Sequence, residues 1–172
     1  MKIIDISQHN GKINFNAVKQ NGIDGVIIRV GWIGNKENHT IDKYFEEYYQ
    51  GATKVGLKVG FYVYSYCKSQ TAIASGTQWF LNKIYNKQCD LACFIDLEDP
   101  TIEYLDKEEL TRHAEVFCKT VESKGKKAGV YVVSENDEIL TTFTEGKLFF
   151  ASLAYASDVT MQKDKEGIAD DA

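Results

Sequence analysis

The 172-residue sequence has few of the features that mark linkers, membrane spans or export signals. It contains one proline and no low-complexity stretch, so no linker divides it, and we expect a single domain over residues 1–172. No apolar run approaches the roughly 18 residues that a membrane span needs. The apolar run at the start is also too short for a signal peptide. The sequence therefore predicts no membrane insertion and contains no visible signal for export through the Sec pathway.

Tightly spaced metal-binding or disulfide-forming residues are also missing. The sequence has four cysteines, none of them in a C-x-x-C pair: Cys67, Cys89, Cys93 and Cys118. Disulfide-built proteins are normally shorter and denser in cysteine, and zinc sites combine closely spaced cysteines with nearby histidines. The three histidines have no mutual spacing that implies a metal. We predict four free, mostly buried thiols and neither a metal nor another cofactor.

An excess of basic residues is absent as well. The chain has 20 Lys and Arg against 25 Asp and Glu, which gives a net charge of −5. A protein whose main partner is a nucleic acid normally needs a basic face to neutralise phosphates. The one dense basic run, residues 124–127, falls where a helix should end and is explained as its C-terminal cap. The composition therefore argues against a nucleic-acid partner.

Short β-branched and aromatic runs alternate along the chain with segments of helical period. The predicted strands are Ile3–Ile6, Gly25–Val30, Val59–Tyr64, Ala92–Leu97, Ala128–Val133, Lys147–Ala151 and Val159–Gln162. The predicted helices are Asn14–Gln20, Ile41–Lys54, Thr71–Tyr85 and Lys107–Ser123. This order predicts an α/β fold with parallel strands joined by right-handed crossovers.

Two α/β architectures have this element order, an open doubly wound sheet and a closed β/α barrel. A doubly wound nucleotide-binding sheet would carry a glycine-rich loop after its first strand, whereas residues 5–11 read Asp-Ile-Ser-Gln-His-Asn-Gly. In β/α barrels, sites are built at the carboxyl ends of the strands. Polar side chains gather at those ends here: Asp5, Arg29, Tyr62, Tyr64, Asp96, Glu98 and Tyr131. We therefore expect an irregular TIM-like barrel.

Two carboxylates stand at the end of a buried strand in the run Phe-Ile-Asp-Leu-Glu-Asp, residues 94–99. Successive strand side chains point to opposite faces, so Asp96 and Glu98 project to the same side. Asp5, at the end of the first strand, would converge on the same mouth. Glycoside hydrolysis uses a carboxylate pair whose pKa values are pushed apart. Aromatic residues near this mouth would suit the faces of sugar rings: Trp32, Tyr62, Tyr64, Tyr66 and Tyr131.

The carboxylates are open to other interpretations. Asp5 could be a turn or cap residue, and Asp96 and Glu98 could form an acidic strand end that faces solvent. Asp99 fits ordinary turn chemistry ahead of a proline. Together these four side chains could instead present oxygen ligands to Mg²⁺ or Ca²⁺ in a metal-dependent hydrolase. Such an enzyme would need basic residues that bind phosphate, or histidines that bind the metal, at the same mouth. Only Arg29 is evident there.

Four ordered motifs carry a family resemblance. They are Asp-Ile-Ser-Gln-His-Asn-Gly with Ile-Asn-Phe, Val-Ile-Ile-Arg-Val-Gly, Gly-Phe-Tyr-Val-Tyr-Ser and Phe-Ile-Asp-Leu-Glu-Asp, at residues 5–15, 26–31, 60–65 and 94–99. In this order they resemble the glycoside hydrolase family 25 lysozymes, which are N-acetylmuramidases of bacteria and their phages. The match is strongest over residues 1–135. The resemblance implies an irregular β/α barrel that cleaves the β-1,4 bond between N-acetylmuramic acid and N-acetylglucosamine in peptidoglycan, with retention of configuration.

The resemblance also implies roles for particular residues. Glu98 matches the general acid that protonates the leaving glycosidic oxygen, and Asp5 matches the first-strand aspartate of the catalytic site. Asp96 matches the first acid of the Asp-x-Glu motif, which either stabilises positive charge or assists attack by the substrate's own acetamido group. Two neighbouring anions would raise the pKa of Glu98 and keep it protonated near neutrality. The expected substrate-binding residues are Tyr62, Tyr64, Arg29, Trp32, Asp42 and Tyr131, with a core role equally open for Trp32.

The C-terminal part of the sequence departs from the family pattern. Residues 149–155 match one late family strand only loosely, no tryptophan follows Trp79, and an eighth strand is not evident. A barrel without its closing strand would leave an unpaired sheet edge, which is a route to a homo-oligomer. A non-catalytic wall-binding or structural protein on the same barrel is the alternative to an enzyme. Either reading places the protein at the cell wall, outside the cell or released in the manner of a phage enzyme.

Overall fold

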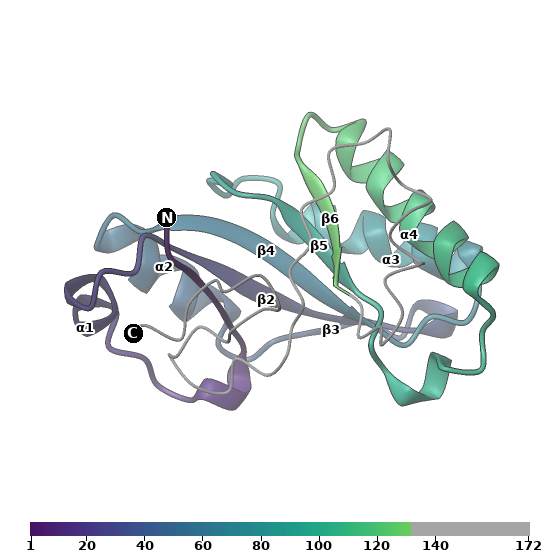
Figure 1. Ribbon diagram of the computed structural model, residues 1–172, viewed down its shortest axis with the longest axis horizontal. Coiled ribbons are helices and arrows are strands. Elements are labelled where there is room, and N and C mark those ends of the chain that lie inside the picture. The colour runs from purple at the N-terminus through teal and green to yellow at the C-terminus, as the bar shows by residue number, and fades with distance from the viewer. Residues whose placement is uncertain (132–172) are drawn as a thin grey trace.

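A parallel sheet forms the centre of the computed structural model, which describes residues 1–131. Its strands are β1 (Ile3–Ile6), β2 (Gly25–Ile33), β4 (Lys58–Ser65), β5 (Cys93–Asp96) and β6 (Ala128–Tyr131). They lie in the order β1-β2-β4-β5-β6, and each neighbouring pair is parallel. The two-residue strand β3 (Thr40–Ile41) pairs antiparallel with β2. All the carboxyl ends of the parallel strands therefore meet at one end of the sheet (Figure 1).

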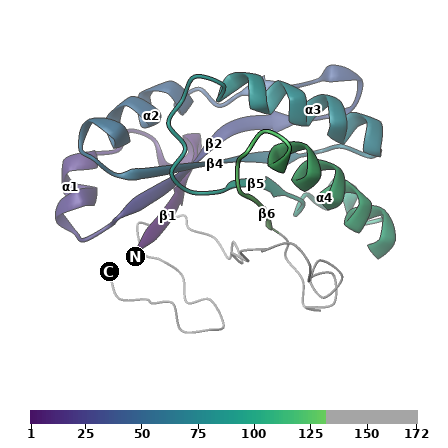
Figure 2. The ribbon, with the colours of Figure 1, turned by 90° about the horizontal axis from the view of Figure 1, so that it is seen from above.

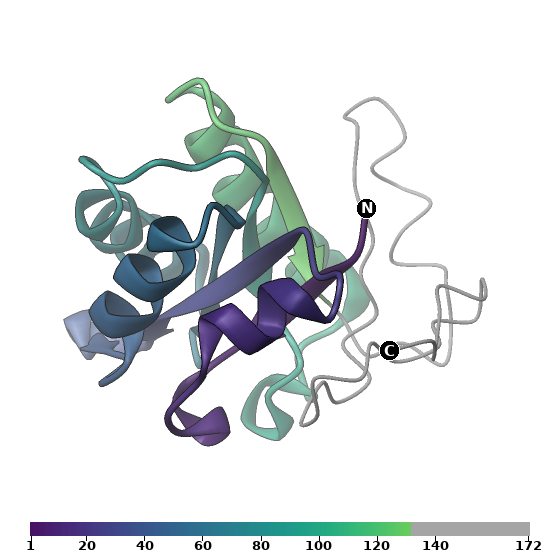
Figure 3. The same ribbon diagram turned by 90° about the vertical axis from the view of Figure 1, so that its left-hand side faces the viewer.

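Four α-helices connect the strands. They are α1 (Phe15–Gln20), α2 (Phe45–Lys54), α3 (Gln70–Lys83) and α4 (Lys107–Glu122), and α2, α3 and α4 cover one face of the sheet (Figure 2). Side-chain oxygens of Asn14, Ser69 and Asp106 accept backbone N–H groups at the starts of α1, α3 and α4. No helix among residues 1–131 is long and apolar enough to cross a membrane. Figure 3 shows the twist of the sheet from its α1 end.

The two faces of the sheet differ in what they bury. One face packs against the helices in a large apolar core that includes Val26, Phe61 and Ile95, each almost fully buried. The other face carries a small cluster of Ile27, Tyr62, Ala92, Phe94 and Tyr131. Strand side chains alternate between these faces, so the residues that follow the small cluster toward the strand ends lie on its face. Asp5, Arg29, Tyr64 and Asp96 therefore lie on the face of the sheet that carries the small cluster.

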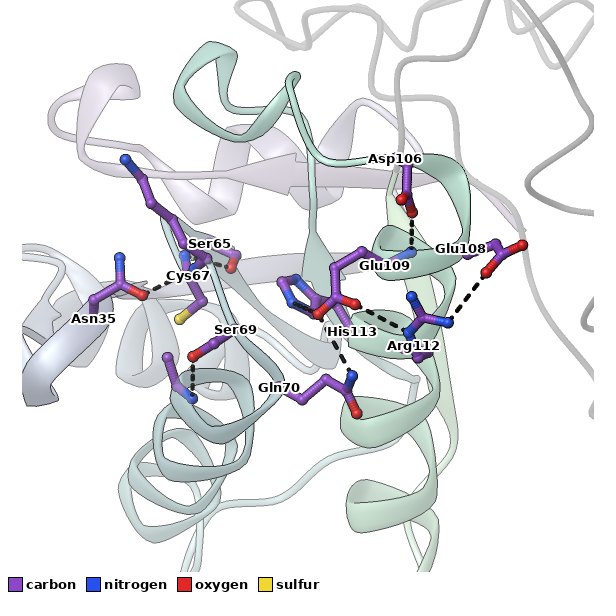
Figure 4. Close-up of polar contacts among 12 residues, drawn as sticks. Asn35, Ser65, Cys67, Ser69, Gln70, Asp106, Glu108, Glu109, Arg112 and His113 are labelled. Atoms are coloured by element: carbon purple, nitrogen blue, oxygen red, sulfur yellow. Dashed lines mark hydrogen bonds and ion pairs between the residues drawn. The ribbon is translucent and has the colours of Figure 1, made fainter.

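Several polar side chains lie at the contact between α3 and α4, near the starts of both helices. Glu109 accepts a hydrogen bond from Arg112 at 3.0 Å, and its other oxygen lies 3.5 Å from the Gln70 amide nitrogen (Figure 4). His113 is fully buried beside them, with Nε2 3.3 Å from Glu109. Burial lowers the pKa of His113. The helices are thus joined by packing around a histidine whose neutral form is favoured.

The predicted elements agree with the structure apart from the end of β2, which runs to Ile33 rather than Val30, and the region near residue 41. The first strand has the predicted bounds, and the predicted helices at 14–20, 71–85 and 107–123 are confirmed to within two residues at each end. The prediction of a helix from Ile41 was wrong, because Thr40 and Ile41 form β3 and α2 begins at Phe45. Asp42 explains the difference, since its side chain accepts the N–H of Tyr44 at 2.9 Å and draws the backbone into a turn. The predicted strands at 147–151 and 159–162, and the closure of the barrel, lie outside the described residues.

The four cysteines are free, as predicted. Cys67, Cys93 and Cys118 are buried, and Cys89 is partly exposed.

A β-bulge in β2 decides which face Trp32 occupies. Arg29 pairs with Tyr62 and Trp32 pairs with Tyr64, so three steps along β2 match two steps along β4. Without the extra residue, Trp32 would lie on the face opposite Arg29. With it, the Arg29 guanidinium lies 5.7 Å from the centre of the Trp32 ring. The bulge therefore brings both side chains to the face that carries the carboxylates.

Replacing Gly31 with alanine tests this bulge. A Cβ atom at Gly31 would collide with the carbonyl oxygen of Thr40 on β3. We expect Gly31→Ala to lower the free energy of unfolding by about 2 kcal/mol, which is a fall in Tm of about 4–8 °C. Gly34→Ala is the comparison, because its Cβ would lie 3.0 Å from the Asn38 carbonyl oxygen, a tight contact but not the overlap expected at Gly31, and it should cost less stability. Equal melting temperatures for the two variants would contradict the close approach of β3.

Candidate active site

Three carboxyl groups converge at the carboxyl ends of β1 and β5. Asp5 lies near the end of β1, Asp96 is the last residue of β5, and Glu98 follows two positions later. The backbone N–H of Glu98 donates to Asp96 Oδ1 at 3.1 Å, which fixes the two acids relative to each other. The three groups also interact through charge, since Asp5 raises the pKa of both Asp96 and Glu98. The fold therefore brings together the three residues that the sequence singled out as catalytic.

All three carboxyl groups hold protons more tightly than ordinary acids. Burial raises the pKa of Asp5 to about 7. Burial, followed by the charges of Glu98 and Asp5, raises the pKa of Asp96 to about 8. Burial and the charge of Asp5 raise the pKa of Glu98 to about 7. Because the groups interact, they titrate as one cluster that retains protons near neutral pH.

Glu98 is more available to a ligand than its neighbour Asp96. It is half-buried, as is Asp5, whereas Asp96 is only 3% exposed. Its Oε1 atom is buried and has no hydrogen-bond partner among residues 1–131. A buried polar atom without a partner is costly, and a ligand oxygen would satisfy it. The geometry thus suits a protonated Glu98 that donates a hydrogen bond, and then a proton, to a bound molecule.

A buried ion pair lies beside the carboxyl cluster. Arg29 Nε donates to Asp42 Oδ2 at 2.8 Å, and the two side chains are almost fully buried. Asp42 also accepts the N–H groups of Gln8 and Tyr44, each at 2.9 Å. Arg29 Nη2 is buried and has no hydrogen-bond partner in the described part of the chain, and the charge of Arg29 lowers the pKa of Asp96. Asp42 therefore holds Arg29 in place, close enough to the acids for its charge to act on them.

The predicted aromatic residues divide into two groups. Tyr62 and Tyr131 are 5% and 2% exposed and belong to the small apolar cluster, where their rings meet edge to face at 5.9 Å. Trp32 and Tyr64 are partly exposed. Tyr64 also lies 5.2 Å from the ring of Tyr66. The first pair supports the site from within the sheet, and the second pair is accessible to a ligand.

Asp99 contributes to the site in a way that its sequence context did not reveal. Its Oδ2 accepts the Tyr64 hydroxyl at 3.0 Å, and its Oδ1 accepts the N–H of Thr101 at 2.8 Å. The second contact is the turn chemistry expected of an Asp before Pro100. The first contact fixes the Tyr64 hydroxyl. No local sequence motif predicts this contact, because the two residues are far apart in sequence. Asp99 is thus both a turn residue and a support for Tyr64.

The carboxylates do not favour the metal-dependent alternative. Both carboxylate oxygens of Asp99 already accept hydrogen bonds, one from Tyr64 and one from Thr101. Among residues 1–131, no group of three or more His, Cys, Asp or Glu side chains is arranged to hold a metal ion.

Comparison with known proteins identifies the family of this site. The model of glycosyl hydrolases family 25 matches residues 4–167. The chain belongs to this family. An autolytic lysozyme of Clostridium acetobutylicum is 30% identical to it over 154 residues, which are 88% of this chain and 44% of the relative. The chain thus spans less than half the length of this curated family 25 relative.

Solved structures of family 25 share the fold. The modular autolysin LytC of Streptococcus pneumoniae, solved with a synthetic peptidoglycan ligand, is 26% identical with a TM-score of 0.65. The match covers 76% of this chain and 32% of LytC. A glycosyl hydrolase 25 of the same organism, described as a virulence factor in host cell invasion, is 28% identical with a TM-score of 0.66, covering 85% and 64% of the two chains. The predicted TIM-like α/β class and the predicted family are therefore confirmed.

Replacing Asp96 with asparagine tests the burial of the acids. Its pKa of about 8, against an ordinary 3.8, means that the folded state binds the proton more tightly than the unfolded state does. The resulting stabilisation is complete below about pH 4 and is lost as the pH rises through about 8. We expect Asp96→Asn to melt at least about 2–4 °C above the wild type at pH 9 and to match it at pH 4.

The control for this comparison is Glu103→Gln, which changes an exposed acid. Its effect on the melting temperature should be small at both pH values. A stabilisation by Asp96→Asn that does not depend on pH would contradict a raised pKa.

Proposed function

We propose that this chain hydrolyses peptidoglycan at the β-1,4 bond between N-acetylmuramic acid and N-acetylglucosamine, with retention of configuration. The observation that carries the proposal is the carboxyl cluster, in which Glu98 has a pKa of about 7 and a buried oxygen that no other described residue bonds. Membership of family 25 and the autolytic lysozyme relative support the same reaction. The substrate class is supported by the peptidoglycan ligand of LytC.

Glu98 acts as the general acid in this proposal. In its protonated form it donates a proton to the glycosidic oxygen as the bond to the anomeric carbon breaks. Its raised pKa keeps a useful fraction protonated near neutral pH. After the leaving sugar departs, the Glu98 carboxylate takes a proton from the attacking water, so one residue serves both steps.

When they are ionised, Asp5 and Asp96 stabilise the positive charge that develops on the sugar ring; because the three acids titrate as one cluster, the proton must lie on Glu98 in the reactive form. An ionised carboxylate near the anomeric carbon lowers the energy of an oxocarbenium-like transition state, either directly or by orienting the substrate's acetamido group. Asp96 is held by the N–H of Glu98, so its orientation relative to the acid is fixed before substrate binds. Both carboxylates also oppose ionisation of their neighbours, which keeps a proton in the cluster.

The predicted substrate-binding residues divide into those that a ligand can reach and those that are buried. Trp32 and Tyr64 are partly exposed and offer ring faces and edges to the sugars. Arg29 offers its free Nη2 to a sugar oxygen or to the acids. The remaining predicted residues, Tyr62, Asp42 and Tyr131, are buried and act by holding these side chains and the sheet in place.

The proposed site of action is the bacterial cell wall, where peptidoglycan lies. Assembly into a homo-oligomer through an open sheet edge stays a prediction. Sedimentation velocity on the full chain tests it, and a strict monomer at all concentrations would contradict it.

Replacing Glu98 with glutamine tests the reaction and the assignment of the acid. Glutamine keeps the shape of the side chain but cannot donate the proton, so we expect turnover of purified cell walls to fall by at least about a thousandfold. Turbidity and the release of reducing ends measure the reaction. Glu103→Gln should retain full activity, and melting curves should show that both variants fold. Absence of hydrolysis by the wild type would overturn the function, and full activity of Glu98→Gln would overturn the acid.

The pH dependence of kcat/KM provides a separate test. Since Glu98 must be protonated in the free enzyme and has a pKa of about 7, we expect kcat/KM to fall about tenfold per pH unit well above pH 7. A rate that stays constant up to pH 9 would contradict a carboxyl group as the acid.

A further inference from the structure

Two thiols lie against each other at the end of the sheet opposite the carboxyl cluster. The sulfur atoms of Cys89 and Cys93 are 3.7 Å apart. Cys93 begins β5 and is fully buried, whereas Cys89 belongs to the loop before this strand and is partly exposed. One thiol is therefore accessible to a small reagent, and the other lies behind it. The proposed hydrolysis makes no use of either group.

The surrounding backbone holds the two sulfur atoms close together. Between the cysteines, Asp90 bonds to Val59 in both directions, through its N–H at 2.8 Å and its side-chain oxygen at 3.0 Å. Cys93 is fixed in the sheet, where its N–H donates to the Lys127 carbonyl at 2.8 Å. The loop is thus fastened to β4 and the strand to its neighbour. The proximity of the sulfurs does not depend on a freely moving segment.

The environment also makes the two thiols unequal in reactivity. The hydrogen bond with Cys93 and the nearby charge of Lys126 lower the pKa of Cys89, against the effect of burial. The same hydrogen bond and burial raise the pKa of Cys93. The thiolate is the reactive form of cysteine, so the exposed member of the pair is also the better nucleophile.

We propose that Cys89 and Cys93 are a modification site that closes to a reversible intramolecular disulfide when the chain meets a peroxide. The Cys89 thiolate attacks one peroxide oxygen, the O–O bond breaks, and hydroxide leaves and takes a proton to become water. The sulfenic acid formed on Cys89 is then attacked by the Cys93 sulfur, the S–O bond breaks, and a second water leaves. Two thiols lose two electrons in total, and one hydrogen peroxide is reduced to two waters.

The bond requires only a local movement. The sulfurs must approach by about 1.7 Å to reach a disulfide length of about 2.05 Å. Cys89 must supply most of this movement, because Cys93 lies within β5, whereas the bonds that fasten the loop to β4 are made by Asp90 and not by Cys89 itself. The disulfide would fasten the loop to the start of β5, the strand that ends in Asp96. It therefore constrains the strand that carries Asp96 without touching this residue.

Peptide mapping of the full chain after peroxide treatment tests this proposal. The protein is treated in its folded state, unfolded, alkylated and digested with trypsin, which releases residues 88–107 as one peptide containing both cysteines. We expect this peptide to lose two hydrogen atoms in mass and to resist alkylation until dithiothreitol is added. Cys67 and Cys118 should be alkylated as in the untreated protein. This measurement needs no variant, so it does not depend on a substitution that could disturb folding.

Three variants separate the roles of the thiols. Cys93→Ser should leave a sulfenic acid on Cys89 that dimedone traps, and Cys89→Ser should leave Cys93 unmodified. Cys118→Ser, which changes another buried thiol, should form the disulfide as the wild type does. The proposal is overturned if the wild-type peptide gains oxygen while Cys93 remains open to alkylation, if it is unchanged, or if either cysteine is found joined to Cys67 or Cys118.

Discussion

The burial of three carboxyl groups at one end of a parallel sheet is the constraint on which the rest of this structure depends. Each carboxylate loses hydration there, and each opposes the ionisation of its neighbours. Asp5 and Asp96 come from strands separated by two others in the sheet order, so the twist and curvature of the whole sheet decide whether they meet. Arg29, itself bonded to Asp42, lowers the pKa of Asp96, but burial and the charges of Glu98 and Asp5 outweigh it. The cluster therefore keeps protons.

The stability that offsets this cluster comes from the other face of the sheet. There the strand side chains and α2, α3 and α4 form the large apolar core, including the fully buried Phe61, Phe80 and Phe117. Only the small cluster around Tyr62, Phe94 and Tyr131 lies on the face of the acids. This division separates the two tasks of the domain. The helix-covered face favours folding, while the strand ends hold polar groups in an arrangement that costs stability and suits proton transfer.

Much of the fold and of the acid cluster could be predicted from local sequence pattern. Alternation along residues 94–98 places Asp96 and Glu98 on one side, and the β/α order places Asp5 at the same end of the sheet. The bulge at Gly31 could not be predicted in this way, because it depends on the approach of β3, a strand of only two residues. The bond from Tyr64 to Asp99 was missed for a similar reason, since it joins separate segments. The sequence also did not reveal that Asp42, predicted to bind substrate, is buried and bonded to Arg29.

The sequence by itself determined the α/β class, the free state of the cysteines, the family and which three acids meet at the strand ends. These depend on periodicity, composition and short ordered motifs, which are local properties of the chain. Only the tertiary structure decided which aromatic rings are accessible, which side Trp32 faces, which acid keeps an unpaired oxygen, and that Cys89 and Cys93 touch. Each of these depends on burial or on contact between segments, and the physical environment of a side chain is fixed only when the chain around it has folded.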